Sequence, residues 1–178
     1  FNNIEFSRIF MAWSIPSLKN QRLNIGFEIL ASILSVGRNS RLVKVLKEEK
    51  NLVQSIYVDV NGGEFSGLLI IEACCDEVNL KNVENEINEV IQDVTSFKNI
   101  TQNELKKAIN IVKSNYIFNL ETSTQLTSFF GNELLWGRKN SIKDFNNHLE
   151  YWNNLNNFKE IINFLSINKF TLIASRGK

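Results

Sequence analysis

The sequence predicts an α+β fold in which helices cover a largely antiparallel sheet, and two observations lead to this class. Two β-rich stretches flank Asn61-Gly62-Gly63, a strong hairpin signal, in the middle of the chain. Stretches with apolar residues at helical spacing are grouped in blocks before and after this hairpin. Such grouping favours α+β over an alternating α/β fold. The predicted order is β-α-α-β-β-α-α-α-β, within a single domain that spans residues 1–178.

The chain before the hairpin predicts one strand and two helices. The stretch from Ile4 to Trp13 is rich in Ile, Phe and Trp and is followed by Pro16, which indicates a strand and then a turn. A helix is expected next, because apolar residues recur at helical spacing up to Gly37, a residue typical of helix C-termini. Residues 42–49 combine apolar and charged side chains at the same spacing and predict a second, short amphipathic helix.

The two hairpin strands are expected over Leu52–Val60 and Phe65–Cys75. Both faces of the second strand are largely apolar, which predicts a central strand that is covered on both sides. Cys74 and Cys75 are neighbours and point to opposite faces of this strand, so we expect two buried thiols rather than a disulfide. Unpaired thiols are typical of a reducing compartment, and the cytoplasm is favoured for this reason.

The chain after the hairpin predicts several helices and one closing strand. An apolar stripe indicates a helix over residues 83–94, and Thr101-Gln102-Asn103-Glu104 is a capping box that begins another. Later signals indicate further helical turns and then a strand, in this order: residues 129–137, a cap at Ser141, residues 158–165 and Lys169–Ala174. The segment from Tyr151 to Asn157 places aromatic residues among asparagines, and we expect it to be an exposed loop.

Composition excludes some classes of partner. Lysine and arginine number 20 and aspartate and glutamate 19, so the formal net charge is +1 and gives no electrostatic footprint for nucleic acid. The longest apolar stretch, Gly67–Ile71, is far shorter than the roughly 20 residues needed to span a bilayer. We therefore expect neither nucleic acid nor membrane as a partner. The chain begins at Phe1 without a methionine, and we expect it to be part of a longer polypeptide.

The segment from Gly37 to Tyr57 carries the most specific signal. It contains Gly37-Arg38-Asn39-Ser40-Arg41-Leu42, then Leu46-Lys47-Glu48, and finally Leu52-Val53-Gln54-Ser55. These residues resemble the Gly-x-x-Ser-Arg-Leu … Leu-Arg-Glu-x-x-Gly-Leu-x-Tyr-Ser segment of the C-terminal halves of insulinase/pitrilysin-family zinc peptidases. The predicted order of strands and helices is similar to that of the family's modules as well.

The resemblance implies the C-terminal module of a zinc metallopeptidase. Members of the family are built from α/β modules that pair into chambers around a peptide, and the N-terminal module carries the zinc. The family's metal motif, His-x-x-Glu-His, is absent from this chain, whose one histidine is His148. We therefore expect no catalytic residue, metal ligand or cofactor here, and zinc in an N-terminal module of the parent or in a partner. The expected partners are that N-terminal module, a related subunit in a homo- or heterodimer, and a peptide substrate.

Lys47 and Gln54 are the candidate substrate-binding residues. In active family members an arginine and a tyrosine seven residues apart contact the substrate near the scissile bond, and the resemblance places Lys47 and Gln54 at these positions. Lysine keeps the positive charge but lacks the planar guanidinium, and glutamine can still hydrogen-bond a peptide carbonyl. A solvated helix residue and an ordinary strand residue are the alternative interpretation of this pair.

Two other hypotheses stay open beside the peptidase module. The parent could be an inactive scaffold or peptide-presenting subunit that works through a zinc-bearing partner chain, because both substitutions weaken a direct role in catalysis. A free-standing interaction domain unrelated to peptidases is the third hypothesis. A sheet with a different order of strands and helices would support it.

Overall fold

The computed structural model of the chain describes residues 6–17, 19–97, 99–135, 137, 141–166 and 169–174. Its elements follow one another in this order: β1 (Ser7–Pro16), α1 (Gln21–Ser35), a π-helix (Val43–Glu49), β2 (Ser55–Asn61), β3 (Ser66–Cys75), a 3₁₀ turn (Glu77–Asn79), α2 (Leu80–Thr95), α3 (Gln102–Phe118), α4 (Ser123–Leu135), α5 (Ser141–Trp152), α6 (Leu155–Asn163), a 3₁₀ turn (Phe164–Ser166) and β4 (Lys169–Ala174). The predicted α+β class is confirmed. The order differs in one respect, because the described chain has five α-helices rather than three between β3 and β4.

The sheet has four strands in the order β2-β3-β1-β4, and each neighbouring pair is antiparallel. The predicted hairpin is confirmed, since β2 ends at Asn61 and pairs with β3. Gly63 suits the turn, because a Cβ atom there would lie 2.6 Å from the carbonyl oxygen of Ser66. The predicted first strand is confirmed from Ser7 onward, whereas Ile4 lies outside the described residues.

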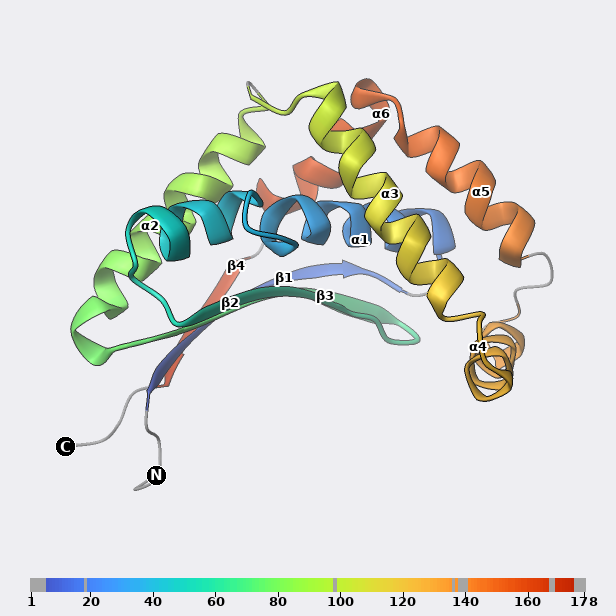
Figure 1. Cartoon of the computed structure of the whole chain (residues 1–178), viewed down its shortest axis with the longest axis horizontal. Coiled ribbons are helices and arrows are strands. Elements are labelled where there is room, and N and C mark those ends of the chain that lie inside the picture. Colours follow the sequence, from blue (N-terminus) through green and yellow to red (C-terminus); the bar gives the residue numbers. More distant parts are fainter. Residues whose placement is uncertain are drawn as a thin grey trace.

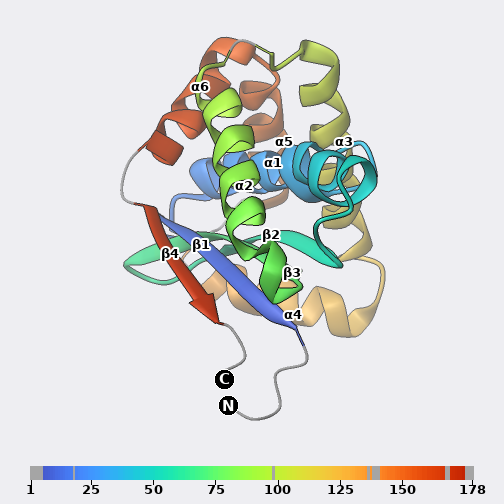
Figure 2. The same cartoon turned by 90° about the vertical axis from the view of Figure 1, so that its left-hand side faces the viewer.

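The helices pack on one face of the sheet (Figures 1 and 2). Helix α1 lies between the sheet and the outer helices, and α4 lies beyond the hairpin end of the sheet (Figure 1). No described residues form a layer over the opposite face. The prediction that β3 is covered on both sides is therefore wrong: β3 is central, but Leu68 on its uncovered face is 41% exposed.

The core fills the space between the sheet and its helices. Strand β1 alternates between the two faces, and its inward residues Ile9, Met11 and Trp13 are fully buried. The indole N–H of Trp13 donates to the carbonyl oxygen of Leu165 at 3.0 Å, which links the sheet to the end of the helical layer. Helix α1 approaches α6 closely, because a Cβ atom on Gly26 would lie 2.5 Å from the side chain of Ile161.

The segment from Tyr151 to Asn157 is not an exposed loop, and this prediction is wrong. Trp152 ends α5, is fully buried, and donates its indole N–H to the carbonyl oxygen of Arg22 at 2.7 Å. Asn154 caps the next helix, α6, because its side chain accepts from the N–H of Asn156 at 2.8 Å. The prediction of two buried free thiols, by contrast, is confirmed for Cys74 and Cys75.

Candidate substrate-contact site

The segment that contains Lys47 is a π-helix rather than the short α-helix that its apolar spacing suggests. The N–H of Lys50 donates to the carbonyl oxygen of Val45 at 3.0 Å, five residues earlier. Leu42 and Leu46 are fully buried and anchor the segment in the core, whereas Lys47 is exposed. Wide helical turns of this kind are rare and occur frequently at functional sites.

The turn that precedes the π-helix is fixed by local hydrogen bonds. Gly37 follows the end of α1 with a φ of +88°, a backbone conformation that glycine adopts without strain. The hydroxyl of Ser40 donates to the carbonyl oxygen of Gly37 at 2.6 Å, and the N–H of Ser40 donates to the same oxygen at 3.1 Å. The carbonyl oxygen of Ser40 then accepts from the N–H of Lys44 at 2.8 Å and begins the helical turns.

Arg41 ties the start of the π-helix to α3. Its Nε and Nη2 atoms donate to the two carboxylate oxygens of Glu104, each at 2.8 Å, and Nη2 also donates to the carbonyl oxygen of Asn99 at 2.8 Å. The side chains of Arg41 and Glu104 are 16% and 27% exposed. The hydrogen-bonded carboxylate raises the pKa of the Arg41 guanidinium. This arginine of the Ser-Arg-Leu motif therefore holds the segment in place.

The far end of the segment is tied to α2 and to the sheet. The ammonium group of Lys50 forms an ion pair with Glu86 of α2. Asn51 has a φ of 47° and reverses the chain, after which Val53 is buried. The N–H of Gln54 then donates to the carbonyl oxygen of Cys74 at 2.8 Å and aligns the chain with β3.

Lys47 and Gln54 are therefore two exposed side chains on a segment that is anchored at both ends. Neither side chain has a hydrogen bond or ion pair within the part of the chain that the structure describes. The structure brings neither side chain into contact with the other. An ammonium group can donate to peptide carbonyl or carboxylate oxygens, and an amide can both donate and accept. The pair can contact a peptide without first breaking an internal bond.

The described residues do not provide a set of ligands for a metal ion. Among the described residues, no three His, Cys, Asp or Glu side chains gather in a way that could hold a metal ion. Cys75 is a poor nucleophile as well, because burial raises the pKa of its thiol. No helix in the described part of the chain is long and apolar enough to cross a membrane.

The uncovered face of the sheet is a functional candidate that the sequence analysis missed. Its outward-pointing side chains come from all four strands and include several large apolar residues. The large apolar members and their exposed fractions are Tyr57 (58%), Leu68 (41%), Phe170 (69%) and Leu172 (64%). We call this surface the open face. The sequence gives no sign of it, because residues 9–13 of β1 are apolar on both faces of the strand.

Comparisons with known proteins identify the class of this module. A family model described as the peptidase M16 inactive domain matches residues 2–112. An uncharacterized zinc protease of Streptomyces coelicolor is 26% identical over 117 residues, which are 65% of this chain and 25% of that protein. Because the family model matches more than half of it, the chain belongs to the peptidase M16 inactive-domain family. The resemblance to insulinase/pitrilysin-family C-terminal modules is thereby confirmed.

Solved structures confirm the fold. A protease from Helicobacter pylori superposes with a TM-score of 0.85 at 18% identity, over 97% of this chain and 42% of that one. The inactive peptidase domain from Bordetella parapertussis gives a TM-score of 0.82 at 12% identity, over 96% of this chain and 92% of that one. The chain thus spans about a quarter of its curated relative and less than half of the Helicobacter protease. The fold and family make it a non-catalytic module related to zinc proteases.

Proposed function

We propose that the chain is the non-catalytic module of a zinc-dependent metallopeptidase and forms part of the wall of a chamber that encloses peptide substrates. The open face is the observation that carries this proposal. A soluble module rarely exposes a continuous apolar surface unless that surface meets a partner. In this family the inactive domain belongs to longer zinc-protease-like chains, which supports another module or a bound peptide as the partner.

The composition of the open face supports contact with a peptide or a second module. Phe10 of β1 lies beside Leu172 of β4, and Ala12 lies beside Phe170, so apolar side chains continue across neighbouring strands. The ion pair between Arg8 and Glu72 lies at one end of this surface. An apolar surface with a charged border resembles the arrangement of protein interfaces, in which a hydrophobic centre is surrounded by a polar rim.

Lys47 and Gln54 are the proposed substrate contacts. Their exposure, their lack of internal partners and the anchoring of their segment by Arg41 and Lys50 support this role. The lysine offers a compact, strongly hydrated charge where active family members have an arginine. We therefore infer that Lys47 and Gln54 bind the peptide backbone more weakly, and with less directional hydrogen bonds, than an arginine and a tyrosine would.

Catalysis in this proposal takes place outside the chain. A zinc ion in an N-terminal module, or in a partner subunit, would supply an activated water, with a glutamate of that module as general base. This chain would pair with the N-terminal module and contribute to a homo- or heterodimer with a related subunit. Its own residues would shape the chamber and hold the peptide.

Peptide cleavage by the full-length natural protein tests the proposed contacts. We expect Lys47→Ala and Gln54→Ala each to raise KM for an unstructured peptide by up to about tenfold, because each removes one hydrogen bond to the substrate. Lys44→Ala is the matched control, since Lys44 lies on the same π-helix and pairs with Glu49 at 3.6 Å. An unchanged KM in both variants, with normal zinc content, would remove these residues from the substrate site.

An inactive scaffold or peptide-presenting subunit is the alternative function. The departures from arginine and tyrosine at Lys47 and Gln54 favour it, because neither residue reproduces the contacts of active members. Zinc analysis of the purified full-length chain separates the two proposals. About one zinc per chain, with chelator-sensitive cleavage, supports the catalytic parent. A zinc-free chain that supports cleavage only with a zinc-bearing partner supports the scaffold.

A further inference from the structure

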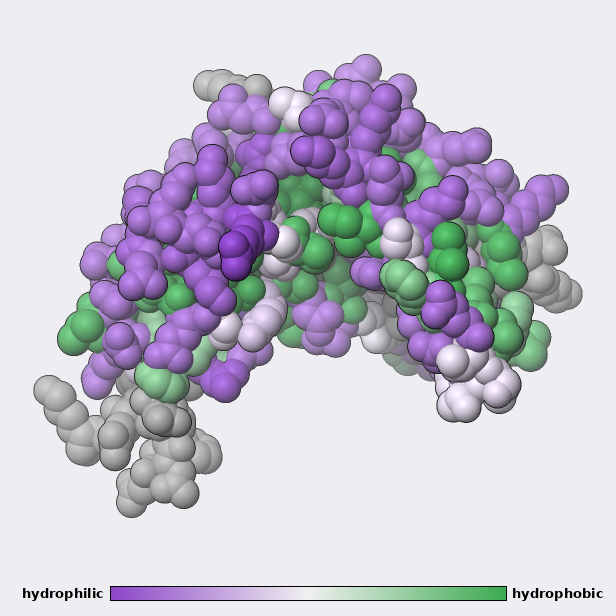
Figure 3. Space-filling model, in the orientation of Figure 1, coloured by the Kyte–Doolittle hydropathy of each residue, from purple (hydrophilic) through white to green (hydrophobic). Residues whose placement is uncertain are grey.

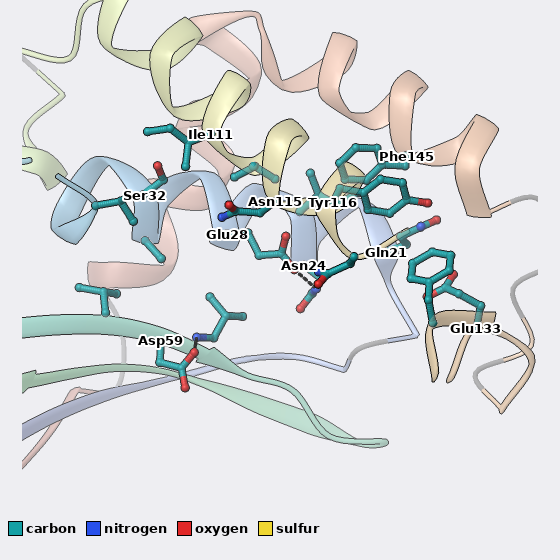
Figure 4. A pocket seen from close by; sticks show the side chains of 18 residues that line it. Gln21, Asn24, Glu28, Ser32, Asp59, Ile111, Asn115, Tyr116, Glu133 and Phe145 are labelled. Carbon is teal, nitrogen blue, oxygen red and sulfur yellow. Dashed lines mark hydrogen bonds between the residues drawn. The ribbon is translucent and has the colours of Figure 1, made fainter. Parts of the chain in front are cut away.

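A long groove runs between α1 and α3, away from Lys47 and Gln54. It consists of two hollows, each of about 420 Å³, which meet at Ser32, Val36 and Ile111. Helix α1 forms the floor, β2 borders the first hollow, and the turn after α1 borders the second. Figure 4 shows the first hollow with α3 above it and Asp59 of β2 below it. We call the two hollows together the α1–α3 groove.

The floor of the groove is a polar stripe on a helix that is otherwise buried. Gln21, Asn24, Glu28 and Ser32 follow one another at intervals of three and four residues and therefore share one face of α1 (Figure 4). Most other positions of α1 are buried in the core. In the space-filling view, hydrophobic residues also gather in the recessed middle of this side, beneath the outer helices (Figure 3). The groove thus offers apolar contact together with a line of hydrogen-bonding groups.

The end of the groove beside β2 is rich in acceptors. The carboxylate of Glu28 lies there and accepts from the side-chain amide of Asn24 at 3.0 Å, and no lysine or arginine is among the described residues that line this hollow. The backbone N–H groups on the free edge of β2 already have hydrogen-bond acceptors. The N–H of Val58 donates to the hydroxyl of Ser35 at 3.0 Å, and the N–H of Val60 donates to the carboxylate of Asp59 at 2.9 Å. A cationic group that donates hydrogen bonds fits this end.

The opposite end of the groove is cationic. Arg38 and Lys107 line it, and neither has a hydrogen bond or ion pair in the described part of the chain. Glu104 also lines this hollow, but its carboxylate is already bound by Arg41. The N-terminus of the 17-residue helix α3, which is capped by Thr101, adds a partial positive charge. An anionic group fits this end.

Ser32 lies where the two hollows meet. The residue is 5% exposed, and its hydroxyl has no hydrogen-bond partner among the described residues. In Figure 4 this hydroxyl points from α1 toward the side of Ile111 on α3. A buried hydroxyl without a partner is unfavourable, so a polar group that enters the groove gains a hydrogen bond at this point. This observation indicates a ligand with polar groups along its length.

We propose that the α1–α3 groove binds a short extended peptide with free termini. Its ammonium group would lie beside Glu28, and its carboxylate beside Arg38 and Lys107. The seven helical steps from Glu28 to Ser35, where α1 ends, span roughly 10 Å, and Arg38 lies three residues further along the chain. An extended peptide advances about 3.3 Å per residue, so about four residues fit between the charged ends. This site is separate from the proposed chamber contacts and does not depend on the function proposed above.

Titration calorimetry on the 178-residue chain tests the proposal with tetra-alanine as the probe. N-acetylation should weaken binding about tenfold, and C-amidation should do so as well, because each removes one charge-assisted contact. In Glu28→Gln the effect of N-acetylation should shrink while that of C-amidation persists. In Arg38→Gln the pattern should reverse. Binding that is indifferent to both blocking groups, or no binding of any of these peptides at millimolar concentration, overturns the proposal.

Matched variants separate this site from general effects of charge. Glu48→Gln and Lys143→Gln remove the same charges from exposed residues outside the groove and should leave both blocking effects unchanged. Circular dichroism at rising temperature establishes that each variant is folded. Loss of binding in these controls equal to that in the groove variants would also overturn the proposal. Cleavage by the full-length protein is a different readout, so failure of the chamber proposal leaves this result intact.

Discussion

The two faces of the sheet differ in what covers them, although the same strands build both. Leu69 and Ile71 of β3 point toward the helices and are fully buried, whereas Leu68 on the opposite face is 41% exposed. The covered face also holds Trp13 in a hydrogen bond to the helical layer. The open face has no such partner among the described residues. Apolar character alone therefore does not tell which face holds the fold together.

This difference indicates that the covered face of the sheet stabilises the fold and that the open face is available for recognition. Burial of apolar side chains against helices supplies most of the free energy of folding. Side chains of the same kind on the open face add little to the isolated chain, because water covers them in both the folded and unfolded states. Substitutions on the two faces should therefore separate loss of folding from loss of partner binding.

Truncation of Trp13 should give the largest effect. Trp13→Ala removes a fully buried side chain and its hydrogen bond to Leu165, and we expect a loss of about 3–5 kcal/mol in the free energy of unfolding. Urea denaturation followed by circular dichroism measures the change. Leu68→Ala on the open face is the control and should cost less than about 1 kcal/mol. Similar losses in both variants would show that the open face is covered in the isolated chain.

A smaller effect is expected where α1 approaches α6. In Gly26→Ala the added methyl group would lie 2.5 Å from the side chain of Ile161, and the resulting overpacking should cost about 1–3 kcal/mol of unfolding free energy. Gly131→Ala in α4 is the matched control, because nothing lies within 4 Å of the added Cβ atom. That variant should be neutral or up to about 1 kcal/mol more stable. Thermal unfolding of both variants decides whether the covered face is as tightly packed as described.

The Arg41 contact should contribute less again. Arg41→Met leaves the carboxylate of Glu104 without its bidentate partner in a partly buried position, and we expect a loss of about 1–2 kcal/mol of unfolding free energy. Lys44→Met removes the exposed pair with Glu49 and should change stability by less than about 0.5 kcal/mol. If urea denaturation gives equal values for the two variants, Arg41 does not anchor the π-helix.

The fold could be predicted where local chemistry decides the structure. Asn61-Gly62-Gly63 forms the hairpin because its residues suit a tight turn, and Thr101 begins α3 as its capping box indicates. The covering of β3 could not be predicted, since apolar side chains on both faces suit a helix layer and a partner surface equally well. The π-helix could not be predicted either. Its buried Leu42 and Leu46 have the spacing of an ordinary α-helix.

The candidate sites divide in the same way. A motif within a short segment of sequence singled out Lys47 and Gln54, which are exposed on an anchored segment, and their role in substrate binding stays a prediction. The α1–α3 groove could not be predicted in this way. Glu28 and Arg38 come from one stretch of the chain, but Lys107 joins them only after α3 packs against α1. Such a site depends on tertiary contacts that no local pattern encodes.

The adjacent cysteines offer the finest test of the difference between the two faces. Cys74 pairs with Arg8 and is turned toward the open face, where it is buried but still 8% exposed, whereas Cys75 points into the core and is 0% exposed. Burial raises the pKa of the Cys75 thiol, so less thiolate forms in the folded protein than in the unfolded chain, whose value is about 8.5. This thiol therefore favours the folded state below that value, and the contribution is lost as the pH rises through the folded pKa.

We expect iodoacetamide at pH 8 to label Cys74 faster than Cys75 in the folded chain, and both at similar rates in urea. Mass spectrometry of the labelled peptides measures the two rates. In a full-length protein whose second module covers the open face, labelling of Cys74 should slow while that of Cys75 stays the same, because only one side of the strand gains a new neighbour. Equal rates in the folded chain would contradict the distinction between the faces. Protection of neither thiol by the longer chain would instead leave the open face free for a peptide.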